Sequence, residues 1–233
     1  MRSELSLDIK KDLYTYIANF ISDNKRNKFD EFIHNRTRYL TVVLENIFQS
    51  QNASAVLRTC DCFGIQDVHI IENEHKYEIN PDVELGSAKW LNLNYYNEKE
   101  HNTLDAINAL RNNGYRIIAT TPHKNDLLLE DLPIDNKVAL LFGTEKDGLS
   151  DIAIQNADAY VKIPMYGFTE SFNISVSAAL SVFNLSERIR KSTINWQLTE
   201  EEIVDVKINW ASNVLKDSER IKNNYLRAKF DLL

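Results

Sequence analysis

Apolar residues near the N-terminus recur at the spacing of one helix face. Ile9, Leu13 and Ile17 follow one another at four-residue intervals, and Phe29 and Ile33 repeat that interval after a polar break. Recurrence every three to four residues is typical of an amphipathic helix. The pattern therefore predicts that the segment 1–39 is helical.

The pattern changes at Leu40, where strand-like and helix-like stretches begin to alternate. A β-rich run at 40–47 precedes a helical stretch from about 53 to 63, which Gly64 ends. Further strands are expected at 67–72, 90–96, 115–121, 137–143 and 159–165, further helices at 99–113, 150–156 and 173–190, and a loop at 75–88. This alternation predicts an α/β fold, in which a parallel sheet carries helices on both faces.

The last segment reads as helical again. Thr199 followed by Glu202 forms a capping box, which marks the start of a helix. Apolar residues then recur from Ile203 to Tyr225, and they predict one long amphipathic helix. We therefore expect a helical N-terminal extension (1–39), an α/β domain (40–192) and a helical C-terminal extension (193–233).

Composition is that of an ordinary globular protein. Of the 233 residues, 43% are hydrophobic and 26% are charged, which is enough to bury a core. The longest unbroken apolar run, 138–142, has five residues, whereas a membrane span needs about 20, so no membrane partner is expected. The first residues lack the apolar stretch of a signal peptide, and Cys60 and Cys62 cannot build a disulfide framework. We expect a cytoplasmic protein with reduced thiols.

Missing motifs disfavour several classes of enzyme. The six glycines are isolated and no G-x-G occurs, which argues against the usual dinucleotide fingerprint and the phosphate-binding loop. No H-E-x-x-H and no G-x-S-x-G is present, so zinc-dependent and ordinary serine hydrolysis are disfavoured as well. Two cysteines alone cannot form a four-ligand zinc site.

The charge distribution leaves a nucleic-acid partner open. The formal net charge of −7 argues against such a partner when it is taken as a whole. Residues 49–190 hold 12 basic and 20 acidic side chains, residues 1–48 hold 8 and 7, and residues 191–233 hold 7 of each. Basic clusters at 25–38 and 216–229 are either solvated helix faces or RNA contacts, and charge alone does not decide between them.

Two stretches at the predicted carboxyl edge of the sheet hold polar residues that the fold alone does not require. Asn52 suits a helix N-cap, and Arg58 lies further along the same helix. The buried strand at 137–142 opens at Gly143 and brings Glu145 to its carboxyl end. Ligands of open α/β sheets bind at that end of the strands.

A third polar stretch, 163–180, is a loop that enters a helix. Ser171, Asn173 and Ser175 cluster where the helix begins. Taken singly, each polar residue of the three stretches also fits a structural role, as a helix cap, an ion-pair partner or a surface charge. Taken together and in this order, they match the motifs of a known family.

The chain resembles the SpoU class of RNA ribose 2'-O-methyltransferases, within the knotted SPOUT superfamily, and most of all its TrmH group. The motif residues are Asn52, Ala55 and Arg58 (N-x-x-A-x-x-R), Gly143, Glu145 and Gly148 (G-x-E-x-x-G), Ile163–Met165 (I-P-M) and Ser171–Ser175 (S-F-N-I-S). The likeness covers about 40–192. Phe172 and Ile174 replace the Leu and Val usual in the family, and the larger Phe172 narrows the expected cofactor pocket.

The resemblance implies a fold and a cofactor that the residue patterns do not. It implies a C-terminal trefoil knot and S-adenosylmethionine bound there largely through main-chain groups, without a metal. By motif position, Thr120, Gly143, Ile163 and Phe172 would line the cofactor site. The resemblance also implies a homodimer with its active site near the subunit interface, to which the helix at 173–190 would contribute.

The resemblance further implies the reaction, which is methylation of a ribose 2'-hydroxyl in tRNA at the D-loop guanosine in position 18. Arg58 would be the principal catalytic residue, either as a general base or as a charged group that binds phosphate and stabilises the alkoxide. Asn52, Glu145, Ser171 and Asn173 would orient Arg58, the ribose and the loops. The alternatives are a ribosomal RNA methyltransferase of the same class and a non-catalytic RNA-binding protein.

Overall fold

A computed structural model describes residues 5–121 and 127–230 of the chain, in two units. The larger unit spans 37–196. The smaller unit combines the two terminal segments, up to residue 36 and from residue 197 on. None of the described helices is long and apolar enough to cross a bilayer.

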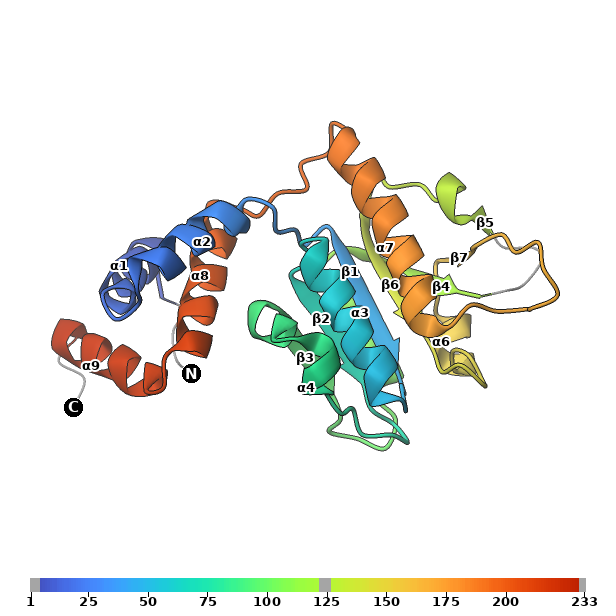
Figure 1. The fold of residues 1–233 in the computed structure, drawn as a ribbon, viewed down its shortest axis with the longest axis horizontal. Coiled ribbons are helices and arrows are strands. Elements are labelled where there is room, and N and C mark those ends of the chain that lie inside the picture. The colour runs from blue at the N-terminus through green and yellow to red at the C-terminus, as the bar shows by residue number, and fades with distance from the viewer. Residues whose placement is uncertain (1–4, 122–126, 231–233) are drawn as a thin grey trace. The chain divides into compact units, whose positions relative to one another are not determined.

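The larger unit is built on a parallel sheet of seven strands, which confirms the predicted α/β fold with a parallel sheet (Figure 1). The order across the sheet is β3-β2-β1-β6-β4-β7-β5. The strands are β1 (Leu40–Glu45), β2 (Asp67–Ile71), β3 (Asn92–Tyr96), β4 (Tyr115–Thr120), β5 (Leu127–Leu128), β6 (Lys137–Phe142) and β7 (Ala159–Lys162). In the central register, Val42 of β1 lies opposite Val68 of β2 and Leu140 of β6.

Helices cover both faces of the sheet. The helices of this unit are α3 (Ser50–Cys62), α4 (Pro81–Glu84), α5 (Thr103–Asn112), α6 (Asp151–Gln155) and α7 (Ile174–Lys191), with short 3₁₀ helices at Ser87–Trp90 and Leu129–Asp131. Helices α3 and α7 lie side by side on one face (Figure 1), and α5 and α6 pack against the other.

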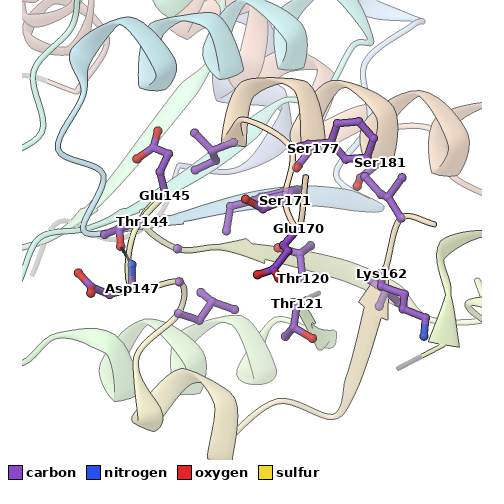
Figure 2. A pocket seen from close by; sticks show the side chains of 18 of the residues that line it. Thr120, Thr121, Thr144, Glu145, Asp147, Lys162, Glu170, Ser171, Ser177 and Ser181 are labelled. Atoms are coloured by element: carbon purple, nitrogen blue, oxygen red, sulfur yellow. Dashed lines mark hydrogen bonds between the residues drawn. The ribbon is translucent and has the colours of Figure 1, made fainter. Parts of the chain in front are cut away.

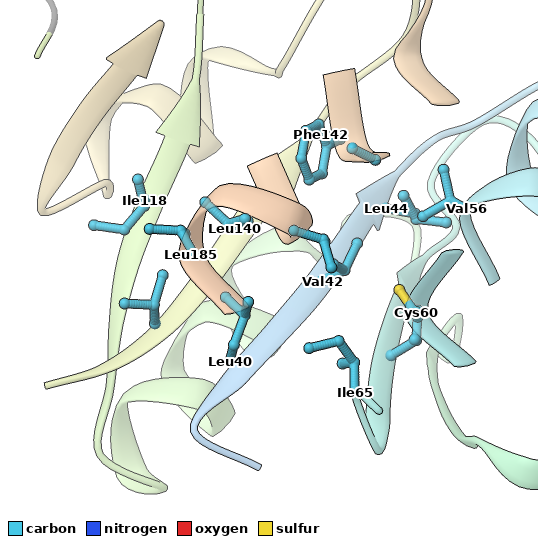
Figure 3. Packing of buried hydrophobic residues seen from close by; sticks show 14 of the residues in the cluster. Leu40, Val42, Leu44, Val56, Cys60, Ile65, Ile118, Leu140, Phe142 and Leu185 are labelled. Atoms are coloured by element: carbon cyan, nitrogen blue, oxygen red, sulfur yellow. The ribbon is translucent and has the colours of Figure 1, made fainter. Parts of the chain in front are cut away.

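Strand alternation explains these two layers. Successive side chains of a strand point to opposite faces, so Val42 packs beneath α3 and α7 while its neighbour Val43 packs against the α5 side. Figure 3 shows Val42 in the first of these clusters with Val56 of α3 and Leu185 of α7. Burial of each such side chain contributes roughly 1.5–3 kcal/mol, so the core fixes where the strand ends lie.

A buried carboxylate joins the helix starts to the carboxyl edge of the sheet. Glu45, the last residue of β1, is 2% exposed. It accepts hydrogen bonds from the Thr103 hydroxyl (2.5 Å), the Ser150 backbone N–H (2.8 Å) and the Ser150 hydroxyl (2.7 Å). Because Ser150 is the N-cap of α6 and Thr103 begins α5, Glu45 fixes both helices beside the ends of β1 and β6.

A buried histidine in β2 has a perturbed acid–base equilibrium. His69 is 9% exposed, and its Nδ1 lies 3.0 Å from the Tyr96 hydroxyl of the neighbouring strand. Burial, which penalises the charged imidazolium, lowers the pKa of His69 to about 4 despite the opposing effect of Asp67. The side chain is therefore neutral at physiological pH.

The smaller unit is a helical assembly of the two ends of the chain. It contains α1 (Leu7–Ala18), α2 (Asp23–Ile33), α8 (Glu200–Val214) and α9 (Ser218–Phe230). Phe29 of α2 packs on Trp210 of α8 with ring centroids 5.4 Å apart. Tyr225, buried in α9, contacts Tyr16 and donates its hydroxyl hydrogen to Asp12. Tyr225 thus belongs to the packing of this unit, as its place in the apolar pattern indicates.

The structure corrects the prediction of one long C-terminal helix. The capping box of Thr199 and Glu202 is present, but α8 ends at Val214, Leu215 is extended, and α9 starts at Ser218. The apolar pattern does not show this break, because Val214 and Ile221 keep helical spacing across it. The polar pair Asp217–Ser218, which is typical of a helix start, was the available signal.

Two smaller expectations also prove wrong. The stretch 75–88 is not all loop, because it contains α4 and the beginning of a 3₁₀ helix. Asn52 is not the N-cap of α3: Gln49 holds that position, and Asn52 lies within the first turn. The amide of Asn52 is therefore available for contacts outside its own helix.

Candidate active site

The loop after β6 is closed by a tight backbone contact. Thr144 and Gly148 exchange hydrogen bonds, with N–O distances of 2.9 and 3.1 Å. A Cβ atom at Gly143 would lie 2.1 Å from the carbonyl carbon of Gly148, so only glycine fits at 143. Gly148 itself has φ +72°, which favours glycine for a different reason. The two glycines thus shape the loop that carries Glu145.

Three residues from three separate motifs meet through hydrogen bonds. The Asn52 amide donates to the carboxylate of Glu145 and, at 2.8 Å, to the side-chain oxygen of Gln49. The Asn173 amide donates to Oδ1 of Asn52 at 3.1 Å. Asn52 is buried, with 9% of its surface exposed, so this network satisfies both donors and the acceptor of its side chain. We call Asn52, Glu145 and Asn173 the amide–carboxylate network.

Asn173 also begins the longest helix of the larger unit. Its side-chain oxygen accepts hydrogen bonds from the Ser175 backbone N–H (2.9 Å) and the Ser175 hydroxyl (2.6 Å), as an N-cap does. The same amide therefore caps α7 with its oxygen and holds Asn52 with its nitrogen. The helix cap and the role in the network coexist in this one residue.

A cavity of about 550 Å³ opens beside this network. Figure 2 shows side chains from α7, from the end of β4 and from the loop after β6 arranged around it. The residues expected to bind the cofactor (Thr120, Gly143, Ile163 and Phe172) all line this cavity, and so do Glu145 and Ser171.

The lining also includes residues that the sequence motifs did not identify. They are Thr121, Lys162, Glu170, Ser177 and Ser181, among others. Ser177 and Ser181 are four residues apart on α7, so both project from one helix face. Small polar residues at that spacing within an apolar helix face were the signal that could have revealed them.

The lining combines apolar walls with an acidic excess. The side chains of Leu129, Phe142, Val161 and Met165 supply apolar surface. The charged lining residues are the acids Glu145, Asp147, Asp151 and Glu170 and the bases Lys146 and Lys162. Four carboxylates against two ammonium groups favour a ligand that carries positive charge. No three His, Cys, Asp or Glu side chains within the described ranges are grouped to hold a metal ion.

Arg58 lies apart from the cavity. It is exposed on α3, does not line the cavity and makes no hydrogen bond or ion pair with any described residue. Its neighbours on the helix, Val56, Leu57 and Cys60, are buried in the core, which fixes the backbone from which it projects. The structure therefore brings together the other four predicted catalytic residues at or beside the cavity, but leaves the Arg58 guanidinium free to reach an external partner.

Comparison with known proteins yields consistent matches. The model of the SpoU rRNA methylase family matches residues 39–183. A curated tRNA (guanosine(18)-2'-O)-methyltransferase from Borreliella burgdorferi is 46% identical over 207 residues, which cover 89% of this chain and 93% of the relative. In structure, the chain is similar to the Aquifex aeolicus TrmH/SpoU tRNA-modifying enzyme, with a TM-score of 0.75, 27% identity and coverage of 83% of this chain and 98% of that one.

A more distant structural likeness concerns the fold alone. The SpoU methyltransferase AviRb from Streptomyces viridochromogenes, solved in complex with the cofactor AdoMet, has a TM-score of 0.56 and 21% identity, with coverage of 70% of this chain and 62% of that one. The family match spans more than half of the chain, and it confirms the resemblance seen in the motifs. The chain belongs to the SpoU rRNA methylase family.

Proposed function

We propose that the protein transfers a methyl group from S-adenosylmethionine to a ribose 2'-hydroxyl of tRNA, at the D-loop guanosine in position 18. The observation that carries this proposal is the amide–carboxylate network, which joins Asn52, Glu145 and Asn173 beside the cavity. The high identity to a curated enzyme named for that activity supports the same reaction and substrate. A tRNA substrate would place the protein in the cytoplasm.

The cavity fits S-adenosylmethionine in size and in chemistry. Its volume of about 550 Å³ is within the usual range of small-molecule sites. Leu129, Ile163 and Phe172 offer apolar surface for a heteroaromatic ring, and the Ser171 and Ser177 hydroxyls offer hydrogen bonds. The excess of carboxylates in the lining suits a ligand that bears a sulfonium and an ammonium group.

The protein's own contribution is to position the ribose and to stabilise charge. S-adenosylmethionine, when bound, supplies a methyl group that its sulfonium already activates. A ribose hydroxyl is a weak acid, so its oxygen must be held in line and the negative charge that develops on it must be stabilised. Glu145 and Asn173 fix the two loops that border the cavity, through Asn52. Ser171 is exposed and lines the cavity, and in this proposal its hydroxyl hydrogen-bonds the ribose.

Arg58 acts as a charged group in this proposal. A guanidinium stays protonated at physiological pH, so it binds a phosphate next to the target ribose and stabilises the developing alkoxide, while the 2'-hydroxyl proton passes to solvent water. Arg58→Ala should reduce methyl transfer by about 10²–10³-fold, as loss of a charge-stabilising donor does, while cofactor affinity measured by calorimetry stays unchanged. A loss of cofactor affinity would contradict this role, because Arg58 lies off the cavity wall.

The exposed face of α7 supports a homodimer. Val176, Leu180 and Phe183 are 43%, 40% and 53% exposed and lie on one helix face. We assign this stripe to a two-fold contact in which α7 meets its copy. Light scattering after size exclusion should give twice the mass of the chain, and Leu180→Glu should give one chain mass. A monomeric wild-type protein would contradict the assignment.

The terminal helices provide the contact with the body of the tRNA. Lys28, Lys216 and Arg227 are exposed and have no ionic partner among residues 5–121 and 127–230. Arg26, Lys222 and Lys229 of the basic clusters have ionic partners within the unit, as Lys222 has Glu219 at 3.1 Å. In this proposal the extensions 1–39 and 193–233 grip phosphates by charge and shape, and the domain 40–192 carries the chemistry.

The proposal includes the trefoil knot of the SPOUT fold. Its support is family membership together with the strand order, in which β6 lies between β1 and β4 although it follows both in the chain. Stretching the chain from both ends in optical tweezers should give an extended length that is shorter than expected for 233 residues, because a knot retains part of the chain. An extension equal to the full contour length would contradict the knot.

A second candidate substrate is ribosomal RNA, which the description of the matching family model favours. Labelled S-adenosylmethionine, incubated with unmodified tRNA, with the same tRNA carrying adenosine at position 18, and with ribosomal RNA, distinguishes the two. Label in the first RNA alone supports the proposed substrate. Label in ribosomal RNA alone keeps the reaction and replaces the substrate, and no label in any of them contradicts the proposed function.

A further inference from the structure

An aromatic pair stands on the loops that follow β1 and β2, and it has no role in the site described so far. Phe48 is 71% exposed, and its ring lies edge-on to the His75 ring with centroids 5.1 Å apart. A phenyl ring this exposed contributes little to folding through burial. Packing in the core therefore does not explain why a phenyl ring stands at this position.

The backbone around this pair is held in place. The side-chain oxygen of Asn46 accepts hydrogen bonds from the backbone N–H groups of Asn73, Glu74 and His75 at 3.1, 2.9 and 3.2 Å. Asn46 itself has φ +60°, in the left-handed region that non-glycine residues rarely occupy. Asparagine adopts this conformation more readily than most non-glycine residues, and the three hydrogen bonds to its side chain hold it here.

The pair lies beside the amide–carboxylate network. Before Phe48 in the chain, Ile47 is buried in the core, with 4% of its surface exposed. After Phe48, the side-chain oxygen of Gln49 accepts a hydrogen bond from Asn52 at 2.8 Å, and the same Asn52 amide binds Glu145. Strands β1, β2 and β6 are parallel neighbours, so the pair and the Glu145 loop follow the same edge of the sheet.

We infer that Phe48 and His75 form a stacking platform for a nucleobase of the substrate RNA, namely a base that flanks the target ribose. The inference rests on the proposed function. Aromatic side chains bind bases of any sequence because every base has a π-face. A flanking base that stacks on this fixed pair sets the orientation of the adjacent target ribose. Phosphate contacts alone hold the backbone without setting that orientation.

The surroundings favour a base over other occupants. Within residues 72–78 the chain carries three glutamates (72, 74 and 78) and one lysine (76), so a phosphate would meet net negative charge there. A protein partner needs a contact of about 800 Å² on each side, which two rings do not supply. An uncharged base needs only the exposed ring face.

The test compares Phe48→Ala with Tyr95→Ala, both in the full-length protein. Tyr95 is a matched control because it is 45% exposed, lies edge-on to Tyr77 and belongs to the strand β3. Phe48→Ala should weaken tRNA binding roughly 10-fold, since one stacked base contributes roughly that factor, and should leave cofactor affinity unchanged. Phe48→Trp, which keeps an aromatic ring at this position, should bind tRNA with the affinity of the wild type. Equal tRNA affinities for Phe48→Ala and Tyr95→Ala would overturn the inference.

A second measurement identifies the stacked base. Two chemically synthesised tRNAs each carry one nucleotide without its base, on the 5' side of the target nucleotide in the first and on the 3' side in the second. Each is titrated with the wild-type protein and with Phe48→Ala. The effect of the substitution should vanish for one of the two tRNAs. An undiminished effect with both would overturn the inference. Because binding is scored separately from methyl transfer, tRNA binding without transfer would contradict the proposed function alone.

Discussion

Substitution of Asn173 can separate the capping of α7 from the amide–carboxylate network. The Asn173 side chain caps the helix through its oxygen and holds Asn52 through its nitrogen. Serine is as good an N-cap as asparagine but has no amide to reach Asn52. Asn173→Ser should therefore keep the cap and lose the contact with Asn52, whereas Asn173→Ala loses both.

The structure gives the expected size of each loss. Loss of the cap costs about 1 kcal/mol. The Oδ1 atom of Asn52 loses its donor in both variants, and an unpaired buried acceptor costs about 1–3 kcal/mol; the low end applies here because removal of the Asn173 amide lets water reach it. We expect a decrease in the free energy of unfolding of about 2 kcal/mol for Asn173→Ala and about 1 kcal/mol for Asn173→Ser.

Methyl transfer should not follow stability in this pair. Both variants break the network at Asn52, so each should lose at least about 10-fold in single-turnover rate at saturating cofactor, which corresponds to about 1.4 kcal/mol. Urea unfolding gives the stability and labelled methyl transfer gives the rate. A rate near wild type for Asn173→Ser would refute the reasoning, because the cap alone would then account for this residue.

Three further predictions concern the cavity loop, the buried histidine and the terminal unit. Gly143→Ala should weaken cofactor binding about 5–150-fold by calorimetry, because overpacking against Gly148 costs about 1–3 kcal/mol; unchanged affinity would contradict the tight loop. As pH falls from about 6.5 to about 4, the unfolded state takes up a proton that buried His69 does not. The free energy of unfolding should therefore fall by about 1.4 kcal/mol per pH unit more in the wild type than in His69→Gln. If urea unfolding gives the same pH dependence of this free energy for both proteins, the prediction is wrong. The logarithm of the tRNA binding constant falls linearly with the logarithm of the salt concentration, and replacing Lys216 and Arg227 by Ala should make this slope shallower by about 2. An unchanged slope would mean that these residues do not contact phosphate.

Local patterns in the sequence predicted most of the larger unit. The alternation of apolar runs with helical spacing identified the parallel sheet, because buried strands such as 137–142 have a signature within a few residues. The motif residues Asn52, Glu145 and Asn173 are 93 and 28 positions apart in the chain. Periodicity alone placed each of them at a helix start or a strand end, and the family resemblance grouped them.

Long-range packing set what the sequence did not predict. The position of β6 between β1 and β4 depends on contacts between distant segments, as does the joining of the two chain ends in one helical unit. The contacts of Asn46 with 73–75 arise only once β1 and β2 are paired. Asn52 reads as an N-cap by residue type, and only the fold shows that its amide faces Glu145 instead.

The most direct test of the account is the position of the methyl group in the product. Unmodified tRNA is incubated with the protein and S-adenosylmethionine, digested with ribonucleases and analysed by mass spectrometry. The account predicts a single new methyl group, on the 2'-oxygen of the guanosine at position 18, which Arg58→Ala forms about 10²–10³-fold more slowly. A methyl group on a base, or on the ribose of another nucleotide, would contradict it.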